Sequence, residues 1–259
     1  MPKLAANLSL MFNEVEFLGR FAAAAKAGFK AVEFLFPYEH DKNVIRQKLD
    51  ENNLQLVLHN LPAGNWANGE RGIGGHADRV AEFEAGVDTA IDYATTLGCR
   101  QLNCLAGVRP SYRDPMEVRE TFIKNLRYAA EKLQVAGIKL LIEAINTRDI
   151  PGFFLTSSAQ AIDIIKAVGS DNLYFQYDIY HMQIMEGDLA PTIEKHLNLI
   201  PHMQLADTPG RHEPGSGEIN YDFLLPHLDK IGYSGWIGCE YKPATTTEAG
   251  LGWFQKYKS

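Results

Sequence analysis

The sequence predicts a single α/β domain, a (β/α)8 TIM barrel that spans residues 1–259 and carries its active site at the C-terminal ends of the strands. Apolar runs bounded by turn residues alternate eight times with amphipathic segments of helical periodicity. Glycine follows several amphipathic segments just before the next apolar run, as a left-handed helix cap requires; these glycines are Gly28, Gly98, Gly137, Gly169 and Gly232. No linker-like stretch interrupts the alternation, so one closed barrel is favoured.

The eight apolar runs define the predicted strands. They occupy residues 5–10, 31–36, 54–60, 101–106, 139–145, 174–178, 202–206 and 236–241. A doubly wound open sheet is the alternative architecture. Such a sheet normally carries a glycine-rich phosphate-binding turn after its first strand, whereas the sequence Leu10-Met11-Phe12-Asn13 follows here.

Three connections on the predicted catalytic face are long, namely residues 61–77, 107–115 and 207–220. Loops of this length in a compact barrel are usually functional. The first contains Trp66 and the glycine-rich run GERGIGG, whose spacing does not match a phosphate-binding loop. We interpret it as a flexible lid, with Trp66 or Arg71 as its working residue.

Composition and charge narrow the class of protein. A net charge of -7 argues against an extended nucleic-acid surface, which needs clustered Lys and Arg. No apolar run approaches the roughly 20 residues of a membrane span, and the N-terminus lacks a signal-peptide pattern, so we expect a cytoplasmic protein without a membrane partner. The cysteines fit neither a disulfide framework nor a zinc site and are expected to be buried thiols; they are Cys99, Cys104 and Cys239.

Four polar residues lie at or near the C-terminal ends of the last four predicted strands: Glu143, Asp178, Gln204 and Glu240. Each alone is more often a structural residue that forms an internal ion pair or hydrogen bond. Together they converge on one mouth of a closed barrel, where their carboxylates would repel each other unless a cation lay between them. The pattern therefore predicts a metal site.

The ligand chemistry indicates which metal to expect. Carboxylate and amide oxygens, with no cysteine and at most one histidine nearby, favour Mg²⁺ or Mn²⁺ over structural zinc. An octahedral ion with four protein ligands leaves about two positions open. Those positions suit two adjacent oxygens of a substrate, a carbonyl and the neighbouring hydroxyl.

Two histidines are predicted to contact the substrate. His59 ends the third predicted strand, and His181 lies one helical turn beyond the sixth. His202 begins the seventh strand at the end opposite the mouth, so no role at the mouth is expected for it.

Three basic residues near the mouth could bind an anionic substrate: Arg71, Arg211 and Lys242. A surface salt bridge is the ordinary explanation for each of them. A substrate carboxylate would need at least one, and arginine offers a bidentate pair of donors.

Six longer segments of the chain carry a family resemblance. They are ANLSLMF, VEFLFPY, HNLPAGNWANGERGI, QYDIYHMQIMEGDL, RHEPGSGEINYDFL and GWIGCEYKPATTTEAGLGW. These segments are similar to those of the hydroxypyruvate isomerase family, a branch of the xylose isomerase-like barrel superfamily. The resemblance covers essentially the whole chain, although the skeleton of Glu, Asp-x-x-His, Gln and Glu is shared with ketose epimerases.

The resemblance implies roles for the acidic residues. Glu143, Asp178, Gln204 and Glu240 would hold the divalent cation, and the two glutamates would also serve as proton donor and acceptor. The expected reaction interconverts hydroxypyruvate and tartronate semialdehyde. The cation would chelate the ketone oxygen and the C3 hydroxyl, one glutamate would remove the C3 proton, and a proton would return to C2. Which glutamate acts first stays open.

The related epimerases also bear on the substrate. His181 and Arg211 match positions that contact substrate oxygens in those enzymes. The epimerases often have histidine at the position of Gln204, and a further glutamate where this chain has Asp149. Both differences favour a small-acid substrate over a ketose sugar.

The sequence is also compatible with other functions. A paralogous isomerase or epimerase of a longer oxo-acid, such as 2-oxo-tetronate, or of a ketose would share the cation site. A metal-dependent phosphodiesterase of the same superfamily would need further histidine ligands and a basic groove, and a sugar-acid sensor would not need both glutamates. A barrel with exposed helices can also form a homo-oligomer.

Overall fold

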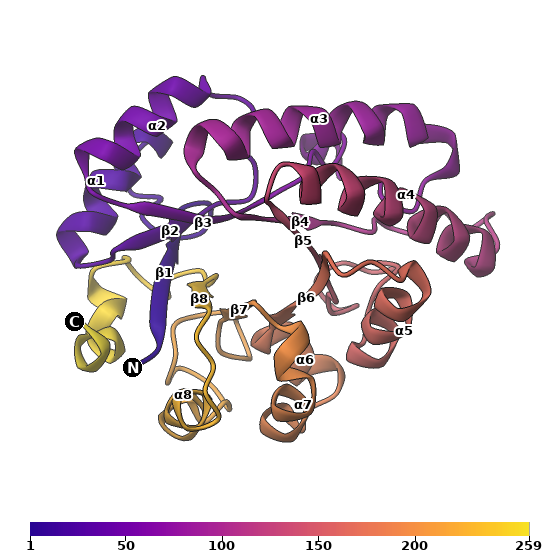
Figure 1. Cartoon of the computed structure of the whole chain (residues 1–259). Helices are drawn as coiled ribbons and strands as arrows, with labels where there is room; N and C mark the ends of the chain where they lie inside the picture. Colours follow the sequence, from indigo (N-terminus) through magenta and orange to yellow (C-terminus); the bar gives the residue numbers. More distant parts are fainter. Residues whose placement is uncertain (259) are drawn as a thin grey trace.

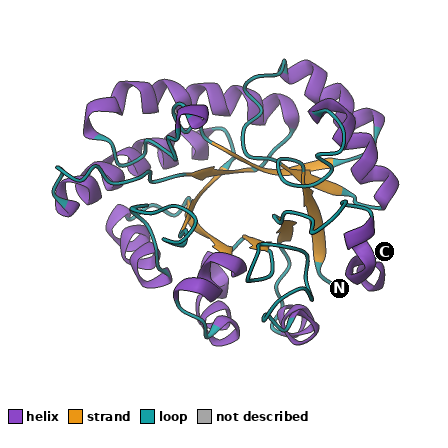
Figure 2. Cartoon of the chain, turned by 180° about the vertical axis from the view of Figure 1, so that it is seen from behind, coloured by secondary structure: helices purple, strands orange, loops and turns teal. Residues whose placement is uncertain are grey.

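The computed structural model describes residues 1–258 and shows a closed barrel of eight parallel strands in chain order. Figure 1 shows the strands as a central ring with the helices around it, and Figure 2 shows the same ring from behind. The strands are β1 (Lys3–Asn7), β2 (Ala31–Glu33), β3 (Gln55–Asn60), β4 (Gln101–Cys104), β5 (Lys139–Glu143), β6 (Leu173–Asp178), β7 (His202–Leu205) and β8 (Trp236–Cys239). The predicted (β/α)8 barrel is confirmed, and the open doubly wound sheet is excluded because β1 pairs with β8.

Helical segments follow the strands and cover the outside of the barrel. The α-helices are α1 (Phe17–Ala27), α2 (Lys42–Glu51), α3 (Val80–Leu97), α4 (Pro115–Val135), α5 (Ser158–Val168), α6 (Ile179–Met185), α7 (Leu189–His196) and α8 (Tyr221–Lys230). The 3-10 helices are η1 (Trp66–Asn68), η2 (Ala77–Arg79), η3 (Leu197–Leu199) and η4 (Ala249–Tyr257). Within residues 1–258, none of these helices combines the length and apolarity that a bilayer crossing requires.

Most strands end earlier than the apolar runs predict. β2 ends at Glu33 and β8 at Cys239, whereas the apolar runs continue to residues 36 and 241. The residues just past the strands are buried or half-buried, so the apolar runs continue beyond the last residues that pair in the sheet. Glu240 thus lies one residue beyond β8, yet its backbone N–H still donates to the carbonyl of Leu205 at 3.0 Å.

The predicted glycine caps are confirmed, because all five glycines have a left-handed backbone, with φ between 69° at Gly137 and 105° at Gly28. The three cysteines are buried and unpaired, as expected.

The barrel interior changes character along its axis. Its lower part is a small apolar cluster of Ala5, Ala31 and Val57, against which Trp236 packs. Two residues further along β1 and β2, the interior side chains are Asn7 and Glu33, both buried and polar. A large hydrophobic core fills the layer between strands and helices. The polar upper interior therefore needs internal hydrogen bonds, which lead directly to the candidate site.

We expect Phe122→Ala to lower the free energy of unfolding by about 3–5 kcal/mol, because it removes a buried ring and leaves a cavity. Phe122 on α4 is 0% exposed and packs edge to face on Phe154 with 6.3 Å between ring centroids. Urea unfolding measures the change. The same substitution at Phe223, which is 55% exposed, is the control and should change stability by no more than about 0.5 kcal/mol. Equal losses in the two variants would contradict this account of the core.

Candidate active site

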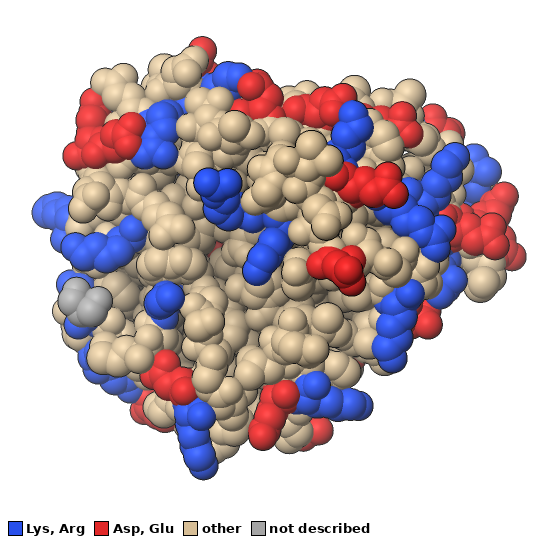
Figure 3. Space-filling model, viewed as in Figure 1, with Lys and Arg blue, Asp and Glu red and all other residues tan. Residues whose placement is uncertain are grey.

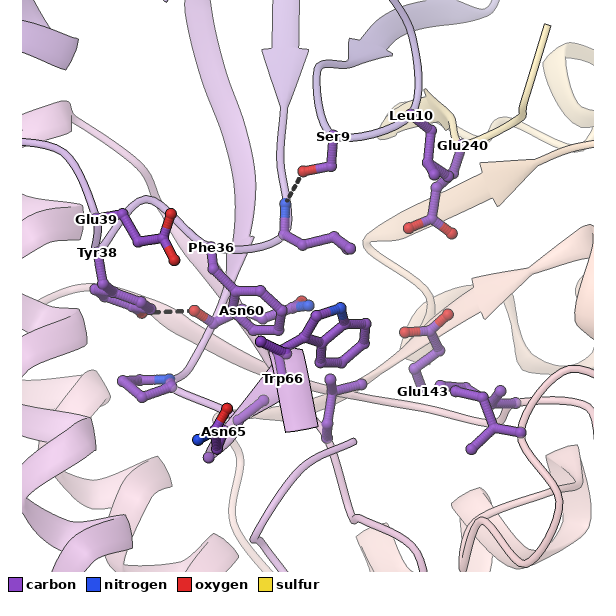
Figure 4. Close-up of a pocket in the computed structure, with 18 of the residues that line it drawn as sticks. Ser9, Leu10, Phe36, Tyr38, Glu39, Asn60, Asn65, Trp66, Glu143 and Glu240 are labelled. Atoms are coloured by element: carbon purple, nitrogen blue, oxygen red, sulfur yellow. Dashed lines mark hydrogen bonds between the residues drawn. The ribbon is translucent and has the colours of Figure 1, made fainter. Parts of the chain in front are cut away.

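A cavity of about 780 Å³ opens at the C-terminal ends of the strands. Its lining includes Glu143, His181, Arg211 and Glu240 from the second half of the chain, and Trp66 from the long loop after β3. Figure 4 shows the carboxylates of Glu143 and Glu240 pointing into the same space, with the Trp66 ring facing them from the other side. The site therefore joins an acidic wall to a largely aromatic and aliphatic one.

The acidic wall contains four buried residues with potential ligand atoms that lie within 4.8 Å of one another: Glu143, Asp178, His181 and Glu240. Glu143 and Asp178 are the last residues of the neighbouring strands β5 and β6, so the pairing of these strands brings their side chains together. Asp178 also caps α6, because its Oδ1 accepts the backbone N–H groups of Tyr180 and His181 at 2.8 and 3.2 Å. The second oxygen of Asp178 is thus free to face the cluster.

Burial of these carboxyl groups makes their negative charge costly. Burial, together with the charges of Glu240 and Asp178, raises the pKa of Glu143 well above its ordinary value. Burial likewise raises the pKa of Glu240 to about 8, against the opposing effect of Arg211. A divalent cation among the carboxylates would remove this penalty, so the donor set fits a metal ion.

Arg211 supplies positive charge to the acidic cluster. Its guanidinium pairs with Glu240 and lies 3.8 Å from Asp178 and 3.7 Å from Asp149. Burial lowers the pKa of Arg211, but the surrounding carboxylates outweigh that effect and raise it. Among residues 1–258, Arg211 is the only lysine or arginine that lines the cavity. The carboxylate of an anionic substrate would therefore pair with Arg211.

His181 is oriented as a hydrogen-bond donor into the site. Asn146 Oδ1 accepts the backbone N–H of Asp149 at 2.7 Å, so the amide nitrogen of Asn146 faces His181 Nδ1 at 2.6 Å. Nδ1 then accepts, and the ring proton lies on Nε2, which is 3.5 Å from Asp178 Oδ2. Burial lowers the pKa of His181 to about 4, which keeps the ring neutral. A donating Nε2–H suits a substrate oxygen better than a metal ion.

Gln204, the fourth expected metal ligand, lies on β7 beside Asp178 in the strand register. Its Nε2 donates to Glu33 Oε1 at 2.8 Å, and its Oε1 accepts from Gln176 Nε2 at 2.6 Å. The amide is therefore held by the polar interior of the barrel, immediately next to the acidic cluster.

The structure places His59 in the outer layer of the barrel rather than in the lining of the cavity. The pairing of β2 with β3 shifts by one residue between Val32 and Glu33, which changes the alternation along β3. Asn60 lines the cavity instead, while the His59 ring stacks on Phe34 with centroids 6.3 Å apart. Burial lowers the pKa of His59 to about 4. Sequence alternation alone did not reveal this irregularity.

Arg71 and Lys242 also lie outside the lining of the cavity. The guanidinium of Arg71 stacks on Trp66 at 4.3 Å from the ring centroid and donates to the carbonyl of Trp66 at 3.0 Å. Arg71 thus supports the loop that presents Trp66. Lys242 is exposed, and its backbone N–H donates to the carbonyl of Arg211 at 2.8 Å.

Two residues that the sequence did not single out position the predicted ones. Asn103 on β4 donates from Nδ2 to Glu143 Oε2 at 2.9 Å. Asp207, which is 0% exposed, accepts the backbone N–H groups of Thr208, Gly215, Gly217 and Ile219 at 2.9–3.0 Å. Asp207 therefore shapes the loop after β7 that carries Arg211. An aspartate at the start of a Gly- and Pro-rich loop was the available signal.

Comparison with known proteins agrees with this architecture. The chain belongs to the xylose isomerase-like TIM barrel family, whose profile matches residues 21–257. It is 51% identical over 258 residues to hydroxypyruvate isomerase of Escherichia coli (strain K12), with 100% of both chains covered. It is 48% identical over 257 residues to 2-oxo-tetronate isomerase of Cupriavidus necator, with 99% of both chains covered. The resemblance that the sequence motifs indicated is confirmed.

Solved structures show the same barrel. A crystal structure described as an AP endonuclease of family 2 from Brucella melitensis has a TM-score of 0.98 at 49% identity and covers 100% of both chains. A 3-keto-D-glucoside 4-epimerase from E. coli has a TM-score of 0.83 at 18% identity, covering 99% of this chain and 100% of its own. At this low identity, the similarity to the epimerase is a similarity of fold alone.

We expect Asp207→Asn to lower the free energy of unfolding by about 1–3 kcal/mol, because an amide NH₂ would face backbone N–H groups that now donate to a carboxylate. Thermal or urea unfolding measures the loss. Asp222→Asn, on the exposed side of α8, is the control and should leave stability within about 0.5 kcal/mol of the parent. Wild-type stability of Asp207→Asn would contradict the role of Asp207 in the loop.

Binding of a divalent cation should strengthen as the pH rises towards about 8, the pKa of Glu240 in the metal-free protein. Below that pH the carboxyl group holds a proton that the cation must displace. By the same linkage, the metal-free fold should lose stability as the pH rises from 4.5, the ordinary carboxyl pKa, to about 8, because the folded state binds more protons than the unfolded state.

Calorimetric titration with Mn²⁺ in buffers of different ionisation enthalpy measures both the affinity and the number of protons released. The exposed variant Glu117→Gln should retain the pH dependence, whereas Glu240→Gln should weaken it. Binding without proton release at pH 7 would show that the carboxyl groups are already ionised.

Proposed function

We propose that the protein is an isomerase that interconverts hydroxypyruvate and 2-hydroxy-3-oxopropanoate, also called tartronate semialdehyde. The observation that carries the proposal is a pair of buried glutamates, Glu143 and Glu240, that face one substrate-sized space and have raised proton affinity. Groups with a pKa nearer to neutrality are suited to removing and returning a proton at a carbon centre. The 51% identity to hydroxypyruvate isomerase of E. coli supports the choice of substrate.

We further propose that the site binds Mg²⁺ or Mn²⁺ through Glu143, Asp178, Gln204 and Glu240. Three buried carboxylates and an amide oxygen are the donors that such hard cations prefer. When bound, the cation would stabilise the negative charge that develops on the enediolate oxygens.

The proton transfers then fall to the two glutamates. One of them removes the proton from C3 of hydroxypyruvate, and the electron pair of that C–H bond forms the C2–C3 double bond of the enediolate. A proton delivered to C2 completes the isomerisation, while the hydroxyl proton passes from the C3 oxygen to the C2 oxygen. Asn103 holds Glu143 by one oxygen at 2.9 Å and leaves the other for the substrate.

The remaining groups of the site orient the substrate. His181 offers its Nε2–H to a substrate oxygen, and Arg211 offers positive charge to the carboxylate. The Trp66 ring, tilted against Phe36 at 4.9 Å between centroids, closes the far wall and excludes water. This division explains why one face of the cavity is acidic and the other apolar.

A longer oxo-acid is the second candidate substrate. The cavity of about 780 Å³ has room for more than a three-carbon acid, and the 48% identity to 2-oxo-tetronate isomerase of C. necator supports a four-carbon chain as the alternative. Both reactions use the same cation site and the same proton transfers, so they differ only in contacts along the apolar wall.

Hydrolysis of a nucleic acid is not favoured, although a similar solved structure is described as an AP endonuclease. The candidate metal cluster in the described part of the chain contains one histidine, His181, and the net charge is -7. On the face in Figure 3, acidic and basic side chains are interspersed rather than gathered into a basic groove. Phosphate neutralisation requires clustered positive charge.

Glu143→Gln and Glu240→Gln should each lower kcat by about 10²–10⁴-fold, because an amide can neither accept nor return the proton. Turnover of hydroxypyruvate, with incorporation of solvent deuterium followed by NMR, measures the loss. The exposed variant Glu117→Gln is the matched control and should keep parental turnover. Near-normal turnover in both glutamate variants would refute the two-glutamate mechanism.

A substrate panel with and without chelator tests the reaction itself. The protein should equilibrate hydroxypyruvate with 2-hydroxy-3-oxopropanoate and lose this activity after metal removal. Turnover of 2-oxo-tetronate without turnover of hydroxypyruvate would establish the second candidate. Cleavage of abasic DNA without either isomerisation would refute both isomerase proposals and favour a nuclease.

A further inference from the structure

The barrel interior contains one more buried carboxylate, Glu33 on β2, which has no part in the proton transfers above. It is 0% exposed and is surrounded by three donors. Asn7 Nδ2, Gln204 Nε2 and His202 Nε2 lie 2.9, 2.8 and 2.7 Å from its oxygens. The absence of a side chain at Gly238 makes room for it, because a Cβ there would overlap the carboxylate.

The hydrogen-bond roles around Glu33 are mutually consistent. Gln101 Nε2 lies 3.1 Å from His202 Nδ1. When Gln101 donates to Nδ1, the ring proton lies on Nε2, which donates to Glu33. Carboxylate oxygens accept hydrogen bonds, which matches the three surrounding donors. His202, at the lower end of β7, thus supports the site from below.

This arrangement determines which way the Gln204 amide faces. Only the NH₂ end of an amide can pair with a carboxylate, so Nε2 must point to Glu33 and Oε1 must point away from it. Gln176 Nε2 donates to that oxygen at 2.6 Å and holds it in the same orientation. Without Glu33, the amide could rotate and present hydrogens, which repel a cation, in place of an oxygen.

Glu33 is also linked to the acidic cluster through the side chain of Asn7. Asn7 Nδ2 is shared between Glu33 Oε1 at 2.9 Å and Glu240 Oε1 at 3.4 Å. Asn7 Oδ1 accepts the backbone N–H of Ser9 at 3.0 Å, which sets the direction of this amide as well. One carboxylate therefore accepts from two amides, one beside Glu240 and the other beside Asp178.

We propose that Glu33 is a positioning residue that holds the Gln204 amide with its oxygen, rather than its nitrogen, available to the divalent cation. The inference rests on the cation site proposed above and is independent of the identity of the substrate. Groups that orient metal ligands from behind commonly change metal affinity by 10- to 100-fold when they are removed.

The test is Mn²⁺ affinity, measured by calorimetry and by the electron paramagnetic resonance signal of free Mn²⁺. Glu33→Gln keeps the shape of the side chain but places an NH₂ group where an acceptor is needed, and it should weaken binding by about 10- to 100-fold. Glu186→Gln is the matched control, since that carboxylate accepts a backbone N–H from Ser158 at 2.7 Å outside the site. It should bind Mn²⁺ as the parent does.

A second substitution separates orientation from packing. In Glu33→Gln/Gln204→Glu, the carboxylate at position 204 presents an oxygen whichever way it turns, and the amide at position 33 can donate to it. Affinity should return towards the parental value, which a purely structural role of Glu33 would not produce. A folded Glu33→Gln variant with parental Mn²⁺ affinity overturns the proposal.

Glu33→Asp covers the case in which Glu33→Gln does not fold. It keeps the charge but withdraws the oxygens from Gln204, so the same loss is expected, and parental affinity would again overturn the proposal. A parent protein that binds Mn²⁺ but isomerises neither oxo-acid would refute the proposed function and leave this inference intact. A parent protein that binds no Mn²⁺ would refute the inference.

Discussion

Repulsion among buried carboxylates is the constraint on which the site depends. Glu143, Asp178 and Glu240 lie in one cluster at the barrel mouth, where burial and mutual proximity make ionisation of all three costly. In the metal-free protein, protons and Arg211 offset that cost. A bound cation would offset it more completely, so the cluster that raises the proton affinity of these glutamates is also a candidate metal site.

The barrel supplies the rigidity that keeps such groups together. Glu143 and Asp178 end paired strands, Glu240 follows β8 by one residue, and each backbone is held in the parallel ladder or by a bond to it. The loop groups are oriented separately, because Asp207 gathers four backbone N–H groups and so sets the path of the chain around Arg211. The strands hold the three carboxylates together. Asp207 shapes the loop that carries Arg211, whose positive charge offsets theirs.

Periodicity in the sequence predicted the eight strands and the helix caps, because burial on two faces and left-handed glycine conformations leave direct marks in the amino-acid pattern. It also predicted that the acidic residues converge, since strand ends in a closed barrel share one mouth. The expectation for His59 depended on its position at the end of the third predicted strand, and a register shift placed Asn60 in the cavity lining instead. An irregularity of one residue in strand pairing has no distinct signature in a single sequence.

The sequence by itself determined the barrel, the acidic residue types at the strand ends and the family resemblance, because each depends on local pattern. Only the tertiary structure decided which groups inside the barrel form hydrogen bonds with those residues or their neighbours. Glu33 and His202 come from strands 169 positions apart and meet inside the closed barrel, where a missing side chain at Gly238 leaves them room. Hydrogen bonds of this kind depend on closure of the barrel and on the direction of each amide, so they exist only once every strand is in place.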